Sequence, residues 1–366
     1  MKTLITIITI ITTALSTLSV NAQMASSEKE LLITLDENTP KALKENQVPG
    51  LAIAIIENEK VIIKKGYGYA DVDGKIAVTS ETGFNIGSIS KMFTAWGIMK
   101  MVEDGKIDLD TPASTYITKW ELPASEFDAN KVTIRNLLQH TAGLSVHGYN
   151  GYESTKELTS ITKSLSGTSR EEEAVTLIME PESKWQYSGG GYTILQLVIE
   201  EVTGETFADY MQKNIFKPLK MNHTSFTIDK KILKKSSKAY DEEAKEIPIR
   251  RFNAQAAAGL HTTLDDLILF ALASYSKNPV LSEKSIELLI SPTELSKGNY
   301  GMGYMEMNRF GDFTLHGHGG SNEGWHAGFM LDFESRSGII ILTNGSSGRN
   351  VLFGNMKDWA QWHGSH

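Results

Sequence analysis

The sequence predicts a mixed α and β fold, in which an antiparallel sheet is flanked by helices and a mostly helical domain is inserted. Two observations lead to this prediction. Runs rich in Ile and Val, typical of strands, lie near both ends of the chain, and helical patterns fill the part between them. The simplest architecture joins both terminal parts in one sheet. We therefore expect an α/β sheet domain over 30–90 and 255–366, and a mostly helical domain over 91–254.

Composition places the chain among globular proteins. It has 366 residues, of which 40% are hydrophobic and 22% charged, enough for one large or two ordinary domains. There is no cysteine, which excludes disulfides and thiol chemistry, so the core must provide the stability. The net charge is -8, and a short basic patch at 230–238 lies beside an acidic one at 241–246. We interpret both as solvated surface and expect no nucleic-acid partner.

Residues 1–22 resemble a secretory signal peptide. Lys2 is followed by a long uncharged run, and the small residues Val20 and Ala22 fit a cleavage site before Gln23. A membrane anchor is the alternative, since the run is just long enough to span. Its many Ser and Thr residues make it a poor anchor. We therefore expect an exported protein, periplasmic or secreted, without a stable membrane anchor.

Five segments have the composition of strands. Residues 51–57 and 61–70 flank a short turn near the beginning of the mature chain. Three further segments follow one another near the end, at 313–320, 326–334 and 338–344. Together they would supply the strands of the predicted sheet.

Helices are indicated between and after these strands. No charged residue lies between Lys91 and Lys100, and the apolar side chains over 92–101 leave no polar face, which is the pattern of a buried helix. The remaining helical segments are 133–144 with a stop signal at Gly143, 192–216 with a break near Gly204, 262–275 with Thr and Asp at its start, and the amphipathic 351–362.

The buried helix begins with a candidate nucleophile and base. Ser88 and Lys91 are three residues apart and so share one helix face, whereas Ser90 points elsewhere. A serine hydroxyl needs a base, and burial lowers the pKa of a lysine enough for it to serve as one. Unpaired N–H groups at the helix start, including that of Ser88, can hold an oxyanion. The alternative makes Ser88 a helix cap and Lys91 a surface charge.

The motif S-x-x-K and its context resemble the family of serine β-lactamases and penicillin-binding proteins. The segments "ETGFNIGSISKMFTAWGIMKMVEDGKIDLDTPASTYI", "VTIRNLLQHTAGL", "ESKWQYSGGGYTILQLVIEEVTGETF", "IFKPLKMNHTSF" and "AAAGLHTTLDDLILFA" look like that family's landmarks in order. The resemblance covers roughly residues 45–360. It points to the branch with class C β-lactamases, D,D-carboxypeptidases and β-lactamase-fold carboxylesterases, and implies a β-lactamase/transpeptidase-like fold. Class A is disfavoured, because neither S-D-N nor K-T-G is found.

The second family element is Y-x-N or Y-S-x, here Tyr187, Ser188 and Gly189. The resemblance implies that Tyr187 and Lys91 handle protons for Ser88. A phenol near a buried ammonium is expected to be biased toward phenolate. Which of the two groups is the formal base stays open, since such a pair titrates together. Gly189 replaces an Asn that usually helps orient the lysine and the substrate amide, which disfavours efficient β-lactam or peptide turnover.

The third family element is K-T-G or H-x-G on a strand that lines the cleft. Here His318, Gly319 and Gly320 match H-x-G, and the resemblance places the second oxyanion N–H on Ser321. Glycines allow a substrate to approach an edge strand closely. A histidine gives less fixed positive charge than a lysine at neutral pH, which favours esters or uncharged substrates. A metal site built on His316 and His318 is the rival interpretation, but no third ligand has a recognisable spacing.

These observations predict an exported serine hydrolase that works through a Ser88 acyl-enzyme, most simply carboxylesterase-like, on a small ester, β-lactam or peptide. The enzymatic alternatives are a D,D-peptidase or D-aminopeptidase and a class C-like β-lactamase. The alternative from another class is a catalytically weak penicillin- or peptide-binding protein. No metal or organic cofactor is expected. His140 is interpreted as a structural, hydrogen-bonded histidine.

Overall fold

A computed structural model describes residues 27–365 of the chain, apart from 154–156, 169–172 and 309. The predicted signal peptide over 1–22 lies outside the described residues. Within the described part, no helix has the length and apolar character needed to cross a bilayer.

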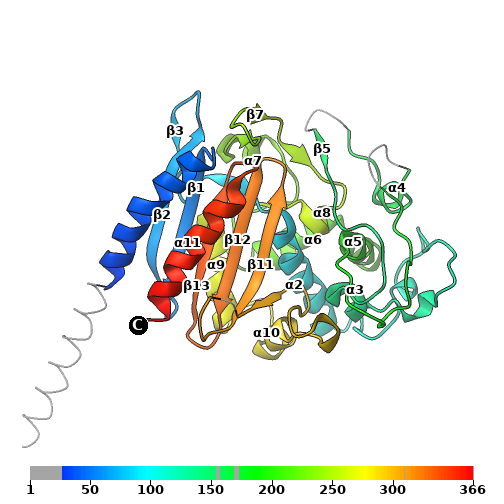
Figure 1. Cartoon of the computed structure of the whole chain (residues 1–366). Coiled ribbons are helices and arrows are strands. Elements are labelled where there is room, and N and C mark those ends of the chain that lie inside the picture. Colours follow the sequence, from blue (N-terminus) through cyan, green and yellow to red (C-terminus); the bar gives the residue numbers. More distant parts are fainter. Residues whose placement is uncertain (1–26, 154–156, 169–172, 309, 366) are drawn as a thin grey trace, which may run out of the picture.

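A seven-stranded antiparallel sheet forms the centre of the molecule (Figure 1). Its strand order is β10-β11-β12-β13-β1-β2-β3, so that β1 pairs with β13 on one side and with β2 on the other. The two terminal parts of the chain therefore share one sheet, as the sequence predicts. The strands are β1 Gly50–Glu57, β2 Lys60–Asp71, β3 Ile76–Ala77, β10 Met305–Met307, β11 Leu315–Asn322, β12 Trp325–Asp332 and β13 Ser337–Thr343.

Strand β1 is buried on both faces, which explains its unbroken apolar sequence. Successive side chains of a strand point to opposite faces. Leu51 and Ile53 pack with a helix over 27–45 and with α11 (Gly348–His363). Ala52 and Ala54 belong to a second core on the other face.

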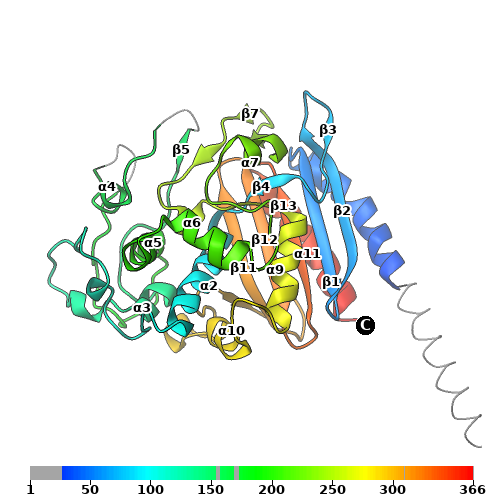
Figure 2. The ribbon, with the colours of Figure 1, turned by 180° about the vertical axis from the view of Figure 1, so that it is seen from behind.

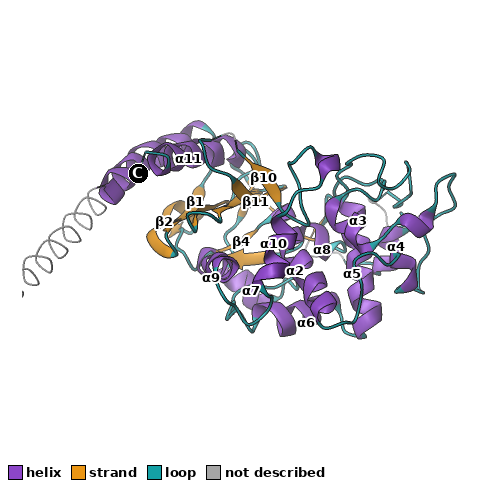
Figure 3. Cartoon of the chain, turned by 90° about the horizontal axis from the view of Figure 1, so that it is seen from below, coloured by secondary structure: helices purple, strands orange, loops and turns teal. Residues whose placement is uncertain are grey.

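Helices cover both faces of the sheet. The helix over 27–45 and α11 lie on one face, and α9 (Leu264–Tyr275) lies on the other with α2 (Ser90–Glu103) beyond it (Figures 1 and 2). Viewed from below, the remaining helices extend to one side of the sheet (Figure 3). The helix over 27–45 was not predicted. Only a few apolar side chains, such as Leu31 and Leu35, mark its buried face.

Helix α2 is buried as the sequence predicts. Eleven of its 14 residues are buried, including Lys91. Phe93 contacts Phe270 of α9 with ring centroids 4.1 Å apart, and the Trp96 indole donates a 2.8 Å hydrogen bond to the Tyr304 hydroxyl. The start of α2 is thus fixed between the sheet and the helical side of the molecule.

The part of the chain over 91–254 is less regular than predicted. Its helices are short apart from α2 and α5, and irregular segments join them. The helix expected over 133–144 ends at Gln139, because His140 already adopts a left-handed conformation with φ 60. The break near Gly204 is confirmed, with φ 69 at that glycine. The division into two domains stays a prediction.

The remaining regular elements are small. The helices are α3 Ile134–Gln139, α4 Ile161–Leu165, α5 Gly189–Thr203, α6 Phe207–Met211, α7 Lys230–Lys235, α8 Gln255–Ala258 and α10 Glu283–Ile290. The short strands pair as β4 Gly83–Asn85 with β9 His261–Thr263, β5 Tyr152–Glu153 with β8 Arg250–Arg251, and β6 Ala239–Tyr240 with β7 Glu246–Ile247. The tight turns are the 3-10 helices η1 Gly87–Ile89, η2 Ala113–Thr115, η3 Ala129–Lys131 and η5 Glu294–Ser296, and the π-helical turn η4 Gln212–Phe216.

Candidate active site

Ser88 lies in the turn η1, directly before α2 and against strand β11. Gly87 has φ 51, a conformation that favours glycine, and a Cβ there would lie 2.6 Å from the Ser321 nitrogen. A Cβ at Gly320 would lie 1.9 Å from the Ile86 oxygen. These two glycines therefore allow the turn and the strand to approach each other closely. Since a Cβ at Gly320 would also lie 3.3 Å from the Ser88 nitrogen, the backbone nitrogens of Ser88 and Ser321 lie near each other.

Lys91 is placed to act on Ser88. Its Nζ lies 3.2 Å from the Ser88 Oγ and donates a 2.7 Å hydrogen bond to the Ala257 carbonyl. The side chain is only 2% exposed, and this burial lowers its pKa to about 7. Nζ also lies 5.0 Å from the Tyr187 ring centroid and 5.5 Å from that of Tyr192. The lysine thus has both the position and the basicity of a general base at neutral pH.

Ser90 has a structural role that the sequence did not reveal. Its hydroxyl donates a 2.6 Å hydrogen bond to the Gly87 carbonyl and accepts a 3.0 Å bond from the Leu260 N–H. The residue is fully buried. It therefore connects the turn that carries Ser88 to the segment before β9, and its hydroxyl is not available as a nucleophile.

Tyr187 lies beside Ser88 and makes a hydrogen bond with its side chain. Burial raises the pKa of Tyr187 well above that of a free phenol, and the bond to Ser88 only partly opposes this shift. The expected bias toward phenolate is therefore wrong. The phenol is neutral in the resting site and holds a proton that it can donate.

The ring of His140 packs against the ring of Tyr187 and orients it. The two rings lie 4.2 Å apart, centroid to centroid. The Ser188 N–H donates to His140 Nδ1 at 3.1 Å, so the ring proton is on Nε2 and is donated to the Tyr300 hydroxyl at 3.1 Å. The interpretation of His140 as structural and hydrogen-bonded is confirmed, and Tyr300 is a supporting residue that the sequence analysis missed.

His318 is buried in β11 and uncharged. Burial and the nearby Lys91 lower the pKa of His318 to about 3. Its Nδ1–H donates a hydrogen bond to the Gly319 carbonyl, whereas Nε2 is buried with no partner among the described residues. The ring lies 6.2 Å from that of Tyr187. Strand β11 therefore brings His318 to the Lys91–Tyr187 pair.

The backbone of the loop over 147–149 lies close to Gly189. Gly189 is buried at the start of α5, and a Cβ there would lie 3.0 Å from the His147 carbonyl and 3.3 Å from the Tyr149 ring. A side chain at this position would meet the backbone of the 147–149 loop. The loop therefore leaves little room for a longer side chain, and the expected effect of Gly189 on substrate turnover stays a prediction.

Three successive carbonyls behind the site are held by side chains from distant segments. Thr94 donates to the Ala256 carbonyl at 2.9 Å, Lys91 to that of Ala257, and Asn322 to that of Ala258 at 3.0 Å. Asn322 also donates to Asn85. The sequence does not predict these contacts. The small residues of "AAAGL", which let helices approach, are the only signal that the sequence offers.

A polar cavity continues from the oxyanion region. Its volume is about 810 Å³. It is lined by Tyr149, Asn150, Glu153, Glu242, Arg250, Ser321, Asn322, Glu323, His326 and Ser346. Ser321, the second predicted oxyanion residue, is thus part of the cavity wall.

The rival metal interpretation gains no further ligand. Among the residues that the structure describes, no group of three or more His, Cys, Asp or Glu side chains could hold a metal ion. His316 packs against the Phe333 ring, with centroids 5.7 Å apart.

Comparison with known proteins agrees with this fold. The chain belongs to the beta-lactamase family, whose model matches residues 35–359, and it is serine-hydrolase-like. It is 27% identical to a solved structure described as the octameric penicillin-binding protein homologue from Pyrococcus abyssi, with a TM-score of 0.74, 88% of this chain and 77% of that chain covered.

Two curated relatives are similar over most of the chain. "Putative penicillin-binding protein PbpX" of Bacillus subtilis is 28% identical, over 93% of this chain and 80% of the relative. "Protein flp" of Staphylococcus aureus strain MRSA252 is 28% identical, over 82% of this chain and 60% of the relative. The chain thus spans less than two thirds of the length of the flp proteins.

Proposed function

We propose that the protein is an exported serine acyl hydrolase that forms an acyl-enzyme on Ser88. One observation carries the proposal: a buried lysine, with its pKa lowered to about 7, lies 3.2 Å from the Ser88 hydroxyl. Near neutral pH a large fraction of Lys91 is then a neutral amine. Such an amine can accept the serine proton, which an ordinary surface lysine cannot.

The reaction follows from the positions of the protons. The Ser88 Oγ attacks the substrate carbonyl, and its proton passes to Lys91, directly or through Tyr187. The oxyanion would be held by the N–H groups of Ser88 and Ser321. When the tetrahedral intermediate collapses, the neutral Tyr187 donates its proton to the leaving oxygen or nitrogen and recovers one from Lys91. Water then attacks the acyl-enzyme, and the same proton transfers in reverse order release the acid and restore Ser88.

The proposed substrates are uncharged esters, so the activity is carboxylesterase-like. His318 is neutral at physiological pH, because its pKa is about 3. It therefore offers no fixed positive charge for a substrate carboxylate. The alternatives stay a D,D-peptidase or D-aminopeptidase, a class C-like β-lactamase, and a weakly catalytic penicillin- or peptide-binding protein. The names of the relatives support the penicillin-binding alternatives.

A side-by-side assay tests the substrate class. We expect kcat/KM for a short-chain p-nitrophenyl ester to exceed that for nitrocefin. A charge-assisted hydrogen bond contributes about 1.5–3 kcal/mol, so its absence lowers turnover of a carboxylate-bearing β-lactam by at least about tenfold. Equal rates would put the β-lactamase alternative first, and faster cleavage of D-Ala-D-Ala peptides would favour the peptidase. No labelling of Ser88 by a fluorophosphonate would favour a binding protein.

Export is proposed from the sequence alone. N-terminal sequencing of protein recovered outside the inner membrane should find a start at or near Gln23. An intact Met1 on membrane-bound protein would favour an anchor.

A further inference from the structure

The turn η1 and the strand β11 approach each other closely, yet no backbone hydrogen bond joins them in the part of the chain that the structure describes. Strand β11 pairs with β12 along nearly its whole length, but with β10 only over 315–317. The rest of its edge lies against η1, where a Cβ at Gly320 would come within 1.9 Å of the Ile86 oxygen. Gly87 and Gly320 remove the steric obstacle to this approach but add no attraction. A fixed spacing therefore needs another contact.

A pair of asparagine side chains supplies this contact. Asn322 is the last residue of β11, and its Nδ2 donates a 2.6 Å hydrogen bond to the Oδ1 of Asn85, the last residue of β4. Among the residues that the structure describes, this is the only hydrogen bond between the segments 83–91 and 315–322. The asparagine pair thus joins the segment that carries the nucleophile to the strand that carries the second oxyanion residue.

The same two amides also hold the turn and a neighbouring helix. The Asn85 Oδ1 accepts a second hydrogen bond, 3.0 Å long, from the Gly87 N–H. The Asn322 Nδ2 donates its other hydrogen to the Ala258 carbonyl of α8 at 3.0 Å. An amide oxygen accepts two hydrogen bonds and an amide nitrogen donates two, so the Asn85 oxygen and the Asn322 nitrogen are both fully paired. Either amide turned the other way would bring like groups together, so each has one orientation.

The asparagine pair lies close to both proposed oxyanion donors. Asn85 is three residues before Ser88 and is only 2% exposed, so water does not compete for its oxygen. Asn322 directly follows Ser321 and reaches the wall of the polar cavity. An oxyanion is stabilised only if both N–H groups point to the one place where the charge develops. A contact that ties the two segments together therefore bears on the reaction.

We propose that Asn85 and Asn322 are positioning residues, which set the spacing between the N–H groups of Ser88 and Ser321 and so complete the oxyanion site. This role rests on the proposed acyl-transfer function and deepens it. The two side chains act through the backbone that they hold, and neither needs to touch the substrate. Their loss should therefore weaken binding of the transition state more than binding of the substrate.

Asn322→Leu tests this role, because leucine is close to asparagine in size and donates no hydrogen bond. We measure kcat and KM for a p-nitrophenyl ester and the inhibition constant of phenylboronic acid. This acid forms a tetrahedral, anionic adduct with a serine hydroxyl, whose oxygen occupies the oxyanion site. Asn350→Leu is the matched control. The Asn350 amide also donates to an asparagine oxygen, that of Asn46 at 3.1 Å, but joins α11 to the end of the helix over 27–45.

Asn322→Leu should lower kcat by a factor between about ten and about a hundred with little change in KM, because a small displacement of an oxyanion donor raises the barrier. The inhibition constant of the boronic acid should rise by a similar factor. Asn350→Leu should leave all three constants unchanged. An effect of Asn322→Leu confined to KM, as loss of a substrate contact in the cavity would give, would overturn the proposal. So would a loss of stability in urea without a change in kcat.

A double-mutant cycle shows whether Asn322 acts through Asn85. In an Asn85→Ala background, Asn322→Leu should lower kcat by a smaller factor than it does alone, because its partner is already lost. Fully additive losses would overturn the proposal. Asn322→Ala, which leaves no large side chain to be packed, should repeat the single-variant result and replaces Asn322→Leu if that protein does not fold.

A failure of the proposed function has a different signature. Unaltered protein that neither hydrolyses the ester nor binds the boronic acid would refute the acyl hydrolase, and the positioning role with it. Unaltered protein that does both, beside an Asn322→Leu variant with the same kcat and the same inhibition constant, would overturn the positioning role and leave the acyl hydrolase in place.

Discussion

At the scale of single residues, the site depends on three groups that burial makes or keeps uncharged. Burial shifts Lys91 toward the neutral amine and keeps Tyr187 and His318 uncharged. The motif S-x-x-K identified Lys91 from the sequence. The apolar run after it indicated that this lysine is buried. The sign of the Tyr187 pKa shift was not predictable, because it is set by burial of the phenol among distant segments, for which the sequence near Tyr187 carries no signal.

Ser88→Ala should remove nearly all ester turnover, typically a loss of several orders of magnitude. Ser90→Ala should leave the fluorophosphonate label on Ser88 but lower the free energy of unfolding by about 1–3 kcal/mol, because the buried Leu260 N–H loses its acceptor. Mass spectrometry and urea unfolding measure the two effects. A label found on Ser90 would show that the nucleophile is misassigned.

Lys91→Ala and Tyr187→Phe should each lower kcat far more than they raise KM, and the two losses should not add, because the residues act as one unit. In the unaltered protein kcat/KM should rise as the pH passes about 7, where the buried Lys91 loses its proton. Stopped assays at pH 5 to 9 measure this. Additive losses in the double variant would contradict a shared proton pathway.

At the scale of elements, the predictable parts are those with strong periodicity. The buried helix α2 and the central strand β1 were recognised because their apolar runs are long and unbroken. The missed parts are held by contacts between distant segments. The Ala257 carbonyl that binds Lys91 carries no side-chain signal in the sequence, and the position of the 147–149 loop against Gly189 depends on tertiary packing.

The close approach of η1 and β11 makes Gly87 a specific requirement. Gly87→Ala should lower ester turnover by at least about a hundredfold, because its Cβ would lie 2.6 Å from the Ser321 nitrogen, one of the proposed oxyanion donors. Gly105→Ala is a matched control, since Gly105 also has positive φ but a Cβ there meets nothing within 4 Å. The control should lose some stability and keep its activity. Equal activity of the two variants would show that the Ser321 N–H does not take part in the reaction.

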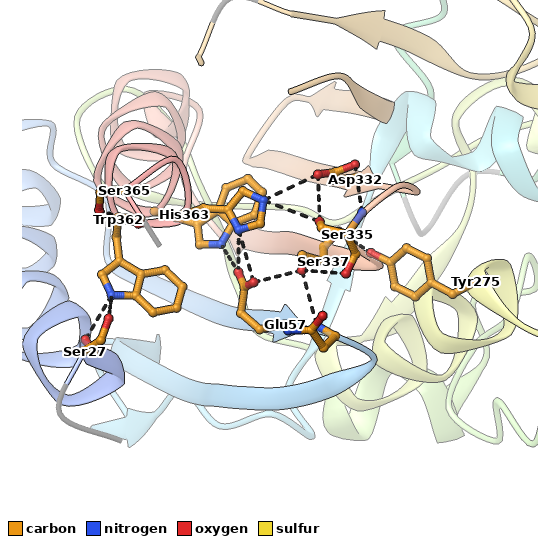
Figure 4. A network of polar contacts seen from close by, with 11 residues as sticks. Ser27, Glu57, Tyr275, Asp332, Ser335, Ser337, Trp362, His363 and Ser365 are labelled. Atoms are coloured by element: carbon orange, nitrogen blue, oxygen red, sulfur yellow. Dashed lines mark hydrogen bonds and ion pairs between the residues drawn. The ribbon is translucent and has the colours of Figure 1, made fainter. Parts of the chain in front are cut away.

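At the scale of the whole molecule, a polar network joins Glu57, in the first strand, to Asp332 and His363, which lie near the end of the chain (Figure 4). His363 at the end of α11 lies 3.1 Å from Glu57 at the end of β1 and 3.5 Å from Asp332 at the end of β12. Ser337 also donates to Glu57 at 2.8 Å. The network joins the last helix to the strands that bring the two parts of the chain into one sheet.

This network should make stability depend on pH. Burial alone would lower the pKa of His363, but hydrogen bonds and charges of Asp332 and Glu57 raise it to about 9, from 6.5 in the unfolded chain. Because the folded pKa is the higher one, the stabilisation is complete below about pH 6.5, declines as the pH rises, and is lost above about pH 9. Its full size is about 3 kcal/mol, at 1.36 kcal/mol per pKa unit.

The titration of Lys91 has the opposite effect on stability over part of the same pH range, because the pKa of Lys91 is lowered in the folded protein. The decline caused by His363 is therefore visible only as a difference in stability between two proteins. Urea unfolding of the unaltered protein and of His363→Gln at pH 6 and pH 9.5 isolates it. The excess stability of the unaltered protein should be large at pH 6 and should shrink by about 3 kcal/mol at pH 9.5. An excess that is the same at both pH values would show that His363 is not charged in the network.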